Sequence, residues 1–126
     1  MAALELTEET FEQTITSHSL VLIDFWAPWC GPCRHFAPVF EAASARHPDA
    51  VFAKVNTDDE QELSAMFEIR SIPTLAIFRD QICVFAQPGA LQKEHLEEII
   101  TRVKALDMDD VRRRIAEHEA NGAQND

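Results

Sequence analysis

Apolar positions along the chain follow two periodicities, and their order predicts a mixed α/β fold. Residues 20–26 form a continuous apolar run that only Asp24 interrupts, as expected for a central strand buried on both faces. Residues 51–55 read as another strand, which Lys54 interrupts. Between these two strands, residues 33–46 carry apolar side chains at helical spacing, and Pro38 should kink that helix. The apolar positions of this helix are Phe36, Val39, Phe40 and Ala43.

The remaining segments complete an alternating order of strands and helices. Thr7 reads as the N-cap of a helix through Ser17. Residues 74–78 and 82–86 are two strands close enough in sequence to form an antiparallel hairpin. We also expect an edge strand at 4–6, a short helix at 61–67 and a long amphipathic helix from Gln92. The order βαβαβαββα predicts an α/β fold with a central mixed five-stranded sheet flanked by helices.

The C-terminal segment stands apart from this pattern, so we divide the chain into a domain, residues 1–106, and an extension, residues 107–126. Met108, Val111, Ile115 and His118 recur at helical spacing, and Asn121-Gly122 should stop that extra helix and leave a frayed tail. Two interpretations are open: a short helix packed on the flank of the domain, or a docking helix through which residues 107–120 self-associate.

Composition and charge exclude several functions. The 126 residues are 46% hydrophobic and 26% charged, as in ordinary globular domains, and no apolar run reaches the roughly 18–20 residues that span a bilayer. The N-terminus has neither a basic nor a long apolar segment, so we expect no secretory signal and a cytoplasmic protein. The net charge of −11 argues against nucleic acids and anionic membranes as partners.

The most specific motif is the sequence Trp29-Cys30-Gly31-Pro32-Cys33, where a strand-like run gives way to a helix-like one. At this spacing both sulfurs lie on one face of the first helical turn and can form a reversible disulfide. The positive end of the helix should lower the pKa of Cys30, the attacking thiol, and leave the more buried Cys33 to resolve the mixed disulfide. Pro32 suits the first helical turn.

Two alternative roles for the cysteine pair are weaker. A zinc site needs four ligands, and the sequence has no second ligand pair, so we expect no metal. A purely structural disulfide is the other alternative, although a close pair in a cytosolic protein is more often catalytic. Cys83 lies alone in an apolar strand, where a buried small hydrophobe is favoured over a regulatory thiol.

Asp24 and Lys54 each interrupt an apolar strand, and both are candidates for proton control. Asp24 precedes Cys30 by six residues, so it can lie beneath the pair and exchange protons with Cys33 through water. Lys54 would be its counter-charge. The alternative for Asp24 is a structural carboxyl group that hydrogen-bonds to the backbone, and the alternative for Lys54 is a surface lysine. The proline of Ile72-Pro73 opens a strand and therefore marks a turn, where a cis peptide is possible.

Taken together, these motifs make residues 4–105 resemble the thioredoxin family. The segments that carry the resemblance are 24–33, Pro38, 54–58, 72–75 and 89–91. The resemblance implies a thioredoxin fold, a cis Pro73 against the cysteine pair, and an apolar docking patch where the Ile72 backbone holds an extended substrate. That patch would comprise Trp29, Pro32, Ile72, Pro73, Gly89 and Ala90.

The resemblance also implies a function, a protein-disulfide reductase without a bound cofactor. Its Cys-Gly-Pro-Cys motif is of the reducing type, and a flavin-dependent thioredoxin reductase using NADPH would restore the dithiol. Asp24 and Lys54 would form a buried pair that tunes the reactivity of Cys33. The chain departs from the family at the Arg79-Asp80-Gln81 turn, where glycine is common, and at Pro88. The alternative function is a binding or chaperone subunit that acts through the acidic C-terminal helix, with an idle dithiol.

Overall fold

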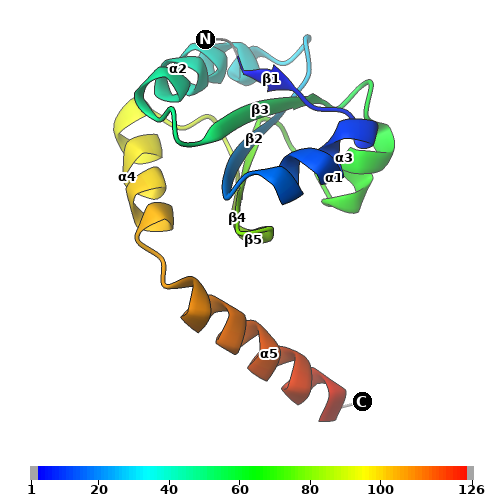
Figure 1. Ribbon diagram of the computed structural model, residues 1–126. Helices are drawn as coiled ribbons and strands as arrows, with labels where there is room; N and C mark the ends of the chain where they lie inside the picture. Colours follow the sequence, from blue (N-terminus) through cyan, green and yellow to red (C-terminus); the bar gives the residue numbers. More distant parts are fainter. Residues whose placement is uncertain (1–2, 125–126) are drawn as a thin grey trace.

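A five-stranded mixed sheet forms the centre of the computed structural model, which describes residues 3–124 (Figure 1). The strands lie in the order β1-β3-β2-β4-β5; β1, β3 and β2 are parallel, and β4 and β5 run antiparallel to their neighbours. Their bounds are β1 (Leu4–Glu5), β2 (Leu20–Trp26), β3 (Val51–Asn56), β4 (Thr74–Arg79) and β5 (Ile82–Pro88). The predicted mixed sheet is confirmed.

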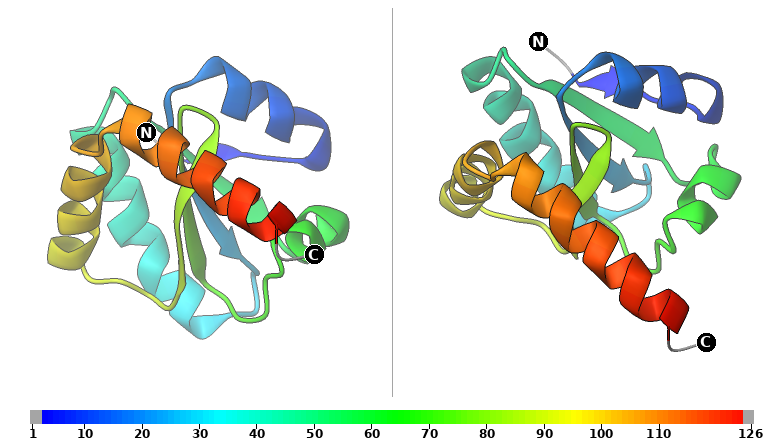
Figure 2. Two further views of the ribbon diagram at one scale, coloured as in Figure 1. Left: turned by 90° about the horizontal axis from the view of Figure 1, so that it is seen from below. Right: turned by 60° about the horizontal axis from the view of Figure 1, so that its bottom comes forward.

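Four helices cover the two faces of the sheet, and a fifth extends away from it (Figures 1 and 2). The helices are α1 (Glu8–Ser17), α2 (Gly31–Arg46), α3 (Gln61–Met66), α4 (Lys93–Lys104) and α5 (Met108–Gln124). One buried cluster joins α2 and α4 to the sheet, and another joins α1 and α3 to the opposite face. Among the described residues, no helix is both long and apolar enough to cross a membrane.

Strand β2 is buried along both faces, as its sequence predicts, and its alternation positions Asp24. Leu20 and Leu22 belong to the cluster beneath α2 and α4, whereas Val21, Ile23 and Phe25 belong to the opposite one. Successive side chains of a strand point to opposite faces, so Asp24 shares the α2 side with Leu22. The cysteine turn begins just after this strand, and the carboxyl group therefore lies beneath it.

The turn between β4 and β5 uses no glycine. Asp80 and Gln81 adopt φ values of 51° and 71°, the left-handed conformation that both central residues of a tight type I′ hairpin require. The Asp80 N–H donates to the carbonyl of Ser19 (2.9 Å), and its carboxylate pairs with Arg112 of α5 (3.1 Å). These contacts offset the strain of the turn and also tie it to the C-terminal helix.

Helix α5 projects from the domain, and only its first turn is packed (Figure 1). Met108 is buried and Val111 half-buried, but Ile115 is 38% exposed and the residues from Arg112 to Gly122 are all exposed. The flank-packing interpretation is therefore wrong beyond that turn. Ion pairs along the helix surface support the exposed segment. They join Asp110 to Arg113 and Arg114, and Arg113 to Glu117.

The base of α5 is held by Arg79 at the end of β4. Its Nη1 donates to three carbonyl oxygens in and after the last turn of α4: Val103 (2.8 Å), Lys104 (3.1 Å) and Leu106 (2.7 Å). The Asp107 carboxylate then accepts from the first free N–H groups of α5. One guanidinium thus donates to carbonyls at the C-terminal end of α4 and anchors the start of α5.

Two other sequence predictions are wrong. The helix does not stop at Asn121-Gly122 but continues to Gln124, because an interior glycine costs only about 1 kcal/mol and Gly122 does not adopt a left-handed cap. Ala123 and Gln124 of the predicted frayed tail are therefore helical, and residues 125–126 lie outside the described residues. Cys83 is exposed rather than buried, because β5 is the edge strand of the sheet.

Candidate active site

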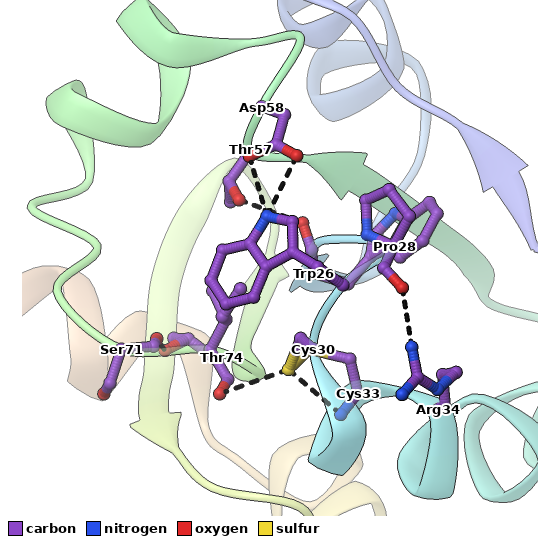
Figure 3. Close-up of a disulfide and its surroundings, with 11 residues drawn as sticks. Trp26, Pro28, Cys30, Cys33, Arg34, Thr57, Asp58, Ser71 and Thr74 are labelled. Atoms are coloured by element: carbon purple, nitrogen blue, oxygen red, sulfur yellow. Dashed lines mark hydrogen bonds between the residues drawn. A yellow bond between two sulfur atoms is a disulfide. The ribbon is translucent and has the colours of Figure 1, made fainter.

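Cys30 and Cys33 form a disulfide at the N-terminus of α2 (Figure 3). Their Cα atoms are 5.3 Å apart, and Cys30 is the N-cap of the helix. The Cys33 N–H points at the Cys30 sulfur, 3.2 Å away. This N–H and the positive helix end both favour a thiolate at Cys30 once the disulfide is reduced. The described residues contain no cluster of three His, Cys, Asp or Glu side chains suited to a metal.

The Ile72–Pro73 peptide bond is cis, as the resemblance implies, and lies against the pair. The Cys30 sulfur is 3.7 Å from the Ile72 carbonyl oxygen, and Ile72 packs against a buried cluster of both cysteines and Ala27. The Gly89 N–H donates to the Pro73 carbonyl oxygen (2.8 Å), and Gly89 adopts φ 111°, which favours glycine. This hydrogen bond brings the loop after β5 beside the cis proline.

The predicted docking residues surround the buried cysteines with varied exposure. Trp29 is 67% exposed, and Pro32, Gly89 and Ala90 are also exposed. Gly31 and Ile72 are half-buried, and Pro73 is buried. The structure brings all of them to the end of the sheet where α2 begins, although they come from three separate segments.

Two side chains to which the sequence assigned no role hold the cysteine turn (Figure 3). The carboxylate of Asp58 accepts the Trp29 indole N–H at both of its oxygens, at 3.2 and 3.0 Å. Arg34 Nη1 donates to the Pro28 carbonyl oxygen, 2.8 Å away. Asp58 lies in the 54–58 motif, two residues after the end of β3, and its place in that motif was the signal available in the sequence.

Asp24 is 4% exposed and lines a small cavity of about 70 Å³ together with Cys33 and Lys54. Its Oδ1 has no hydrogen-bond partner among the described residues, and neither has the Trp26 indole N–H, which lines the same cavity. Burial raises the pKa of Asp24 to about 7, although the charge of Lys54 opposes the rise. The cavity is large and polar enough to hold water between Asp24 and Cys33.

Lys54 faces Asp24 across the β2–β3 ladder, where the two residues are in register. Its ammonium group lies 5.3 Å from the centre of the Trp26 ring, and it makes no close ion pair with Asp24 within the described structure. A half-buried lysine over an aromatic ring acts on the carboxyl group through space, which fits its opposing effect on the Asp24 pKa.

The geometry defines a class of protein: a thioredoxin-fold domain with a disulfide-forming pair at a helix N-terminus beside a cis proline. The family model for thioredoxin matches residues 2–102, and the chain belongs to the thioredoxin family. A putative thioredoxin 2 of Streptomyces coelicolor is 53% identical over 119 residues, covering 94% of this chain and 89% of that protein. Thioredoxin 1 of Synechococcus elongatus is 43% identical and covers 79% and 95%.

Solved structures agree with this assignment. A mutant thioredoxin of Halobacterium salinarum superimposes with a TM-score of 0.77 at 31% identity, covering 83% of this chain and 93% of that one. Plasmodium falciparum thioredoxin gives 0.74 at 32% identity, with 79% and 98% covered. The predicted thioredoxin fold is confirmed, and the chain is a protein-disulfide reductase. The binding-module alternative is not better supported.

Proposed function

We propose that Cys30 attacks the substrate disulfide and that Cys33 resolves the resulting mixed disulfide. The different surroundings of the two sulfurs carry this assignment. Cys30 lies by the Ile72 carbonyl oxygen at the docking surface, whereas Cys33 lines the inner cavity with Asp24. A substrate therefore approaches Cys30, and the proton acceptor lies beside Cys33.

The proposed steps balance in atoms and electrons. The Cys30 thiolate bonds to one substrate sulfur, and the other substrate sulfur leaves as a thiolate that takes up a proton. Cys33 then loses its proton through cavity water to the ionised Asp24 carboxylate and attacks the Cys30 sulfur. The first substrate sulfur leaves, and the two electrons that reduce the substrate come from formation of the Cys30–Cys33 disulfide.

The docking role is proposed for the exposed rim around the pair. The apolar surfaces of Trp29, Pro32, Gly89 and Ala90 would contact the substrate, and backbone groups at Ile72 would pair with an extended segment. Gly31 and Pro73 would shape the surface without contributing large side chains. Backbone pairing is indifferent to substrate sequence.

We further propose that a thioredoxin reductase using NADPH restores the dithiol in the cytoplasm, as part of cellular redox homeostasis and electron transport. Family membership and the Cys-Gly-Pro-Cys motif support this direction of electron flow. The pair itself carries the electrons, so the cycle needs no cofactor bound to this chain.

A coupled assay tests the direction. With NADPH, a bacterial thioredoxin reductase and insulin, the wild-type chain should sustain NADPH oxidation, and Cys30→Ser should abolish it. Cys83→Ser removes an exposed thiol far along the edge strand and should retain the rate. Insulin reduction by the dithiol form without turnover in the coupled system would contradict the proposed electron donor.

The division into a catalytic domain, residues 1–106, and an extension, residues 107–126, remains a proposal, supported by the family match ending at residue 102 and by the projection of α5. The Streptomyces coelicolor match of 119 residues includes part of the extension. We propose that residues 107–120 self-associate through the stripe that exposes Ile115.

Sedimentation velocity tests the proposed self-association. The wild-type chain should show a concentration-dependent increase in sedimentation coefficient, and Ile115→Glu should abolish it because a charge would enter the contact. Ala116→Glu, on a neighbouring face of α5, is the matched control and should still associate. A monomer at all concentrations of the wild-type chain would exclude self-association.

A further inference from the structure

The arginines of this chain are almost all paired with other groups of the protein. Arg34 and Arg79 bond to carbonyl oxygens, and the others with partners form ion pairs with carboxylates. Within the described residues, Arg70 is the exception: it is exposed and has neither a hydrogen bond nor an ion pair. A free guanidinium is notable in a chain of net charge −11, where carboxylates greatly outnumber cations.

Arg70 lies at the substrate side of the molecule. It lines a groove of about 350 Å³ together with Trp29 and Ile72, two residues of the docking surface. It also lines a smaller hollow of about 220 Å³ with Gln87 and Pro88, on the side of β5. Arg70 therefore borders both depressions and lies two residues before Ile72, which precedes the cis proline.

The charges around this groove leave Arg70 available for a partner. Asp58, the acid nearest to the Trp29 side, already accepts the indole N–H of Trp29. Glu68 adjoins the smaller hollow but not the groove of Trp29. A planar guanidinium that is unpaired and exposed favours a carboxylate, which it can bind through two parallel hydrogen bonds.

We propose that Arg70 is a specificity residue, which selects substrate segments with an acidic side chain close to the reacting cysteine. This inference rests on the proposed docking of an extended segment at Ile72. Residues along an extended chain advance about 3.3 Å each, so a side chain two positions from the contact with Ile72 lies about 7 Å away. Arg70 is likewise two positions from Ile72 in this chain, on the segment that leads into β4. Backbone pairing at Ile72 then binds a segment of any sequence, and Arg70 adds a preference for segments with an acidic side chain.

Peptides of one length and sequence provide the test. Each carries a single cysteine blocked by 5-thio-2-nitrobenzoate, whose release measures attack by Cys30, and has Glu, Gln or Lys two residues before or after that cysteine. The wild-type dithiol protein should favour Glu over Gln about threefold, and Glu over Lys about tenfold, at one of the two positions. Arg70→Gln should erase that preference, and Arg70→Glu should invert it.

The control variant is Arg102→Gln, which removes one positive charge at an exposed ion pair on α4, away from the groove. It changes the net charge by the same amount as Arg70→Gln but outside the groove, so it should retain the wild-type preference. The same Glu preference in Arg70→Gln and wild type, or no Glu preference in wild type, would overturn the inference. Loss of attack on the Gln peptide in the wild-type protein would instead contradict the proposed role of Cys30.

Discussion

Replacing Cys33 with serine is expected to turn the reductase into a covalent trap. Cys30 can still attack a substrate disulfide, but no second sulfur lies in the inner cavity to release the product. Multiple-turnover reduction should fall by about a thousandfold or more, as when other catalytic nucleophiles are removed. A mixed disulfide should accumulate to one per chain, visible on a non-reducing gel and by mass spectrometry, and dithiothreitol should release it.

Two variants show which sulfur forms the adduct. Cys30→Ser combined with Cys33→Ser should form no adduct at this site, and Cys33→Ser combined with Cys83→Ser should form it as readily as Cys33→Ser alone. Cys83 lies on the exposed edge strand, where partial desolvation of its sulfur raises the pKa of the thiol and so disfavours attack. Peptide mapping of the adduct to Cys83 would refute the assignment of Cys30 as the nucleophile.

The second large effect concerns stability, which Asp24→Asn should increase at high pH. The pKa of Asp24 rises from 3.8 in the unfolded chain to about 7 in the folded protein. The folded state therefore holds the Asp24 proton more tightly, and the contribution of this group to stability is greatest below pH 3.8 and falls as the pH rises toward 7. The full loss above pH 7 corresponds to about 4 kcal/mol. Asparagine stays neutral and escapes this loss.

Denaturant unfolding of the oxidised protein measures this difference. The advantage of Asp24→Asn over wild type should grow by about 3 kcal/mol between pH 5 and pH 8. Asp59→Asn, an exposed change of the same chemistry, should alter stability little at either pH. A pH-independent difference would mean that Asp24 ionises as readily in the folded chain as in the unfolded one.

The same variant should lose function as it gains stability. Without the Asp24 carboxylate as proton acceptor for Cys33, release of the mixed disulfide should slow most near neutral pH, where Asp24 changes its charge. Rapid acid quenching after mixing with a disulfide substrate follows this step directly. Unchanged release kinetics would remove Asp24 from proton transfer while leaving its effect on stability intact.

Local patterns predicted the site well wherever neighbouring residues determine the structure. The strand-to-helix change at residues 26–33 places Cys30 at the helix N-terminus, and Thr7 caps α1 through a reciprocal bond with Thr10. The charged residue within an apolar strand correctly indicated a buried Asp24. In each case the deciding interactions lie within a few residues of the chain.

Other features depend on contacts between distant segments, and there the sequence was insufficient or misleading. Cys83 is exposed because β5 is the outermost strand, and strand order does not follow from periodicity. Helix α5 begins where Arg79 donates hydrogen bonds to three carbonyl oxygens that lie 24 to 27 residues further along the chain. The Trp29–Asp58 contact likewise joins residues 29 positions apart.

The sequence by itself determined the order of the elements, the position of the reactive cysteines and the presence of a carboxyl group in an apolar strand. Those properties follow from side-chain periodicity and helix capping, which act over a few residues. Only the tertiary structure decided what surrounds them: the cavity that joins Asp24 to Cys33, the cis proline against Cys30, and the free Arg70 beside Trp29. Long-range packing brings these groups together, because burial and electrostatic coupling depend on distance in space rather than along the chain.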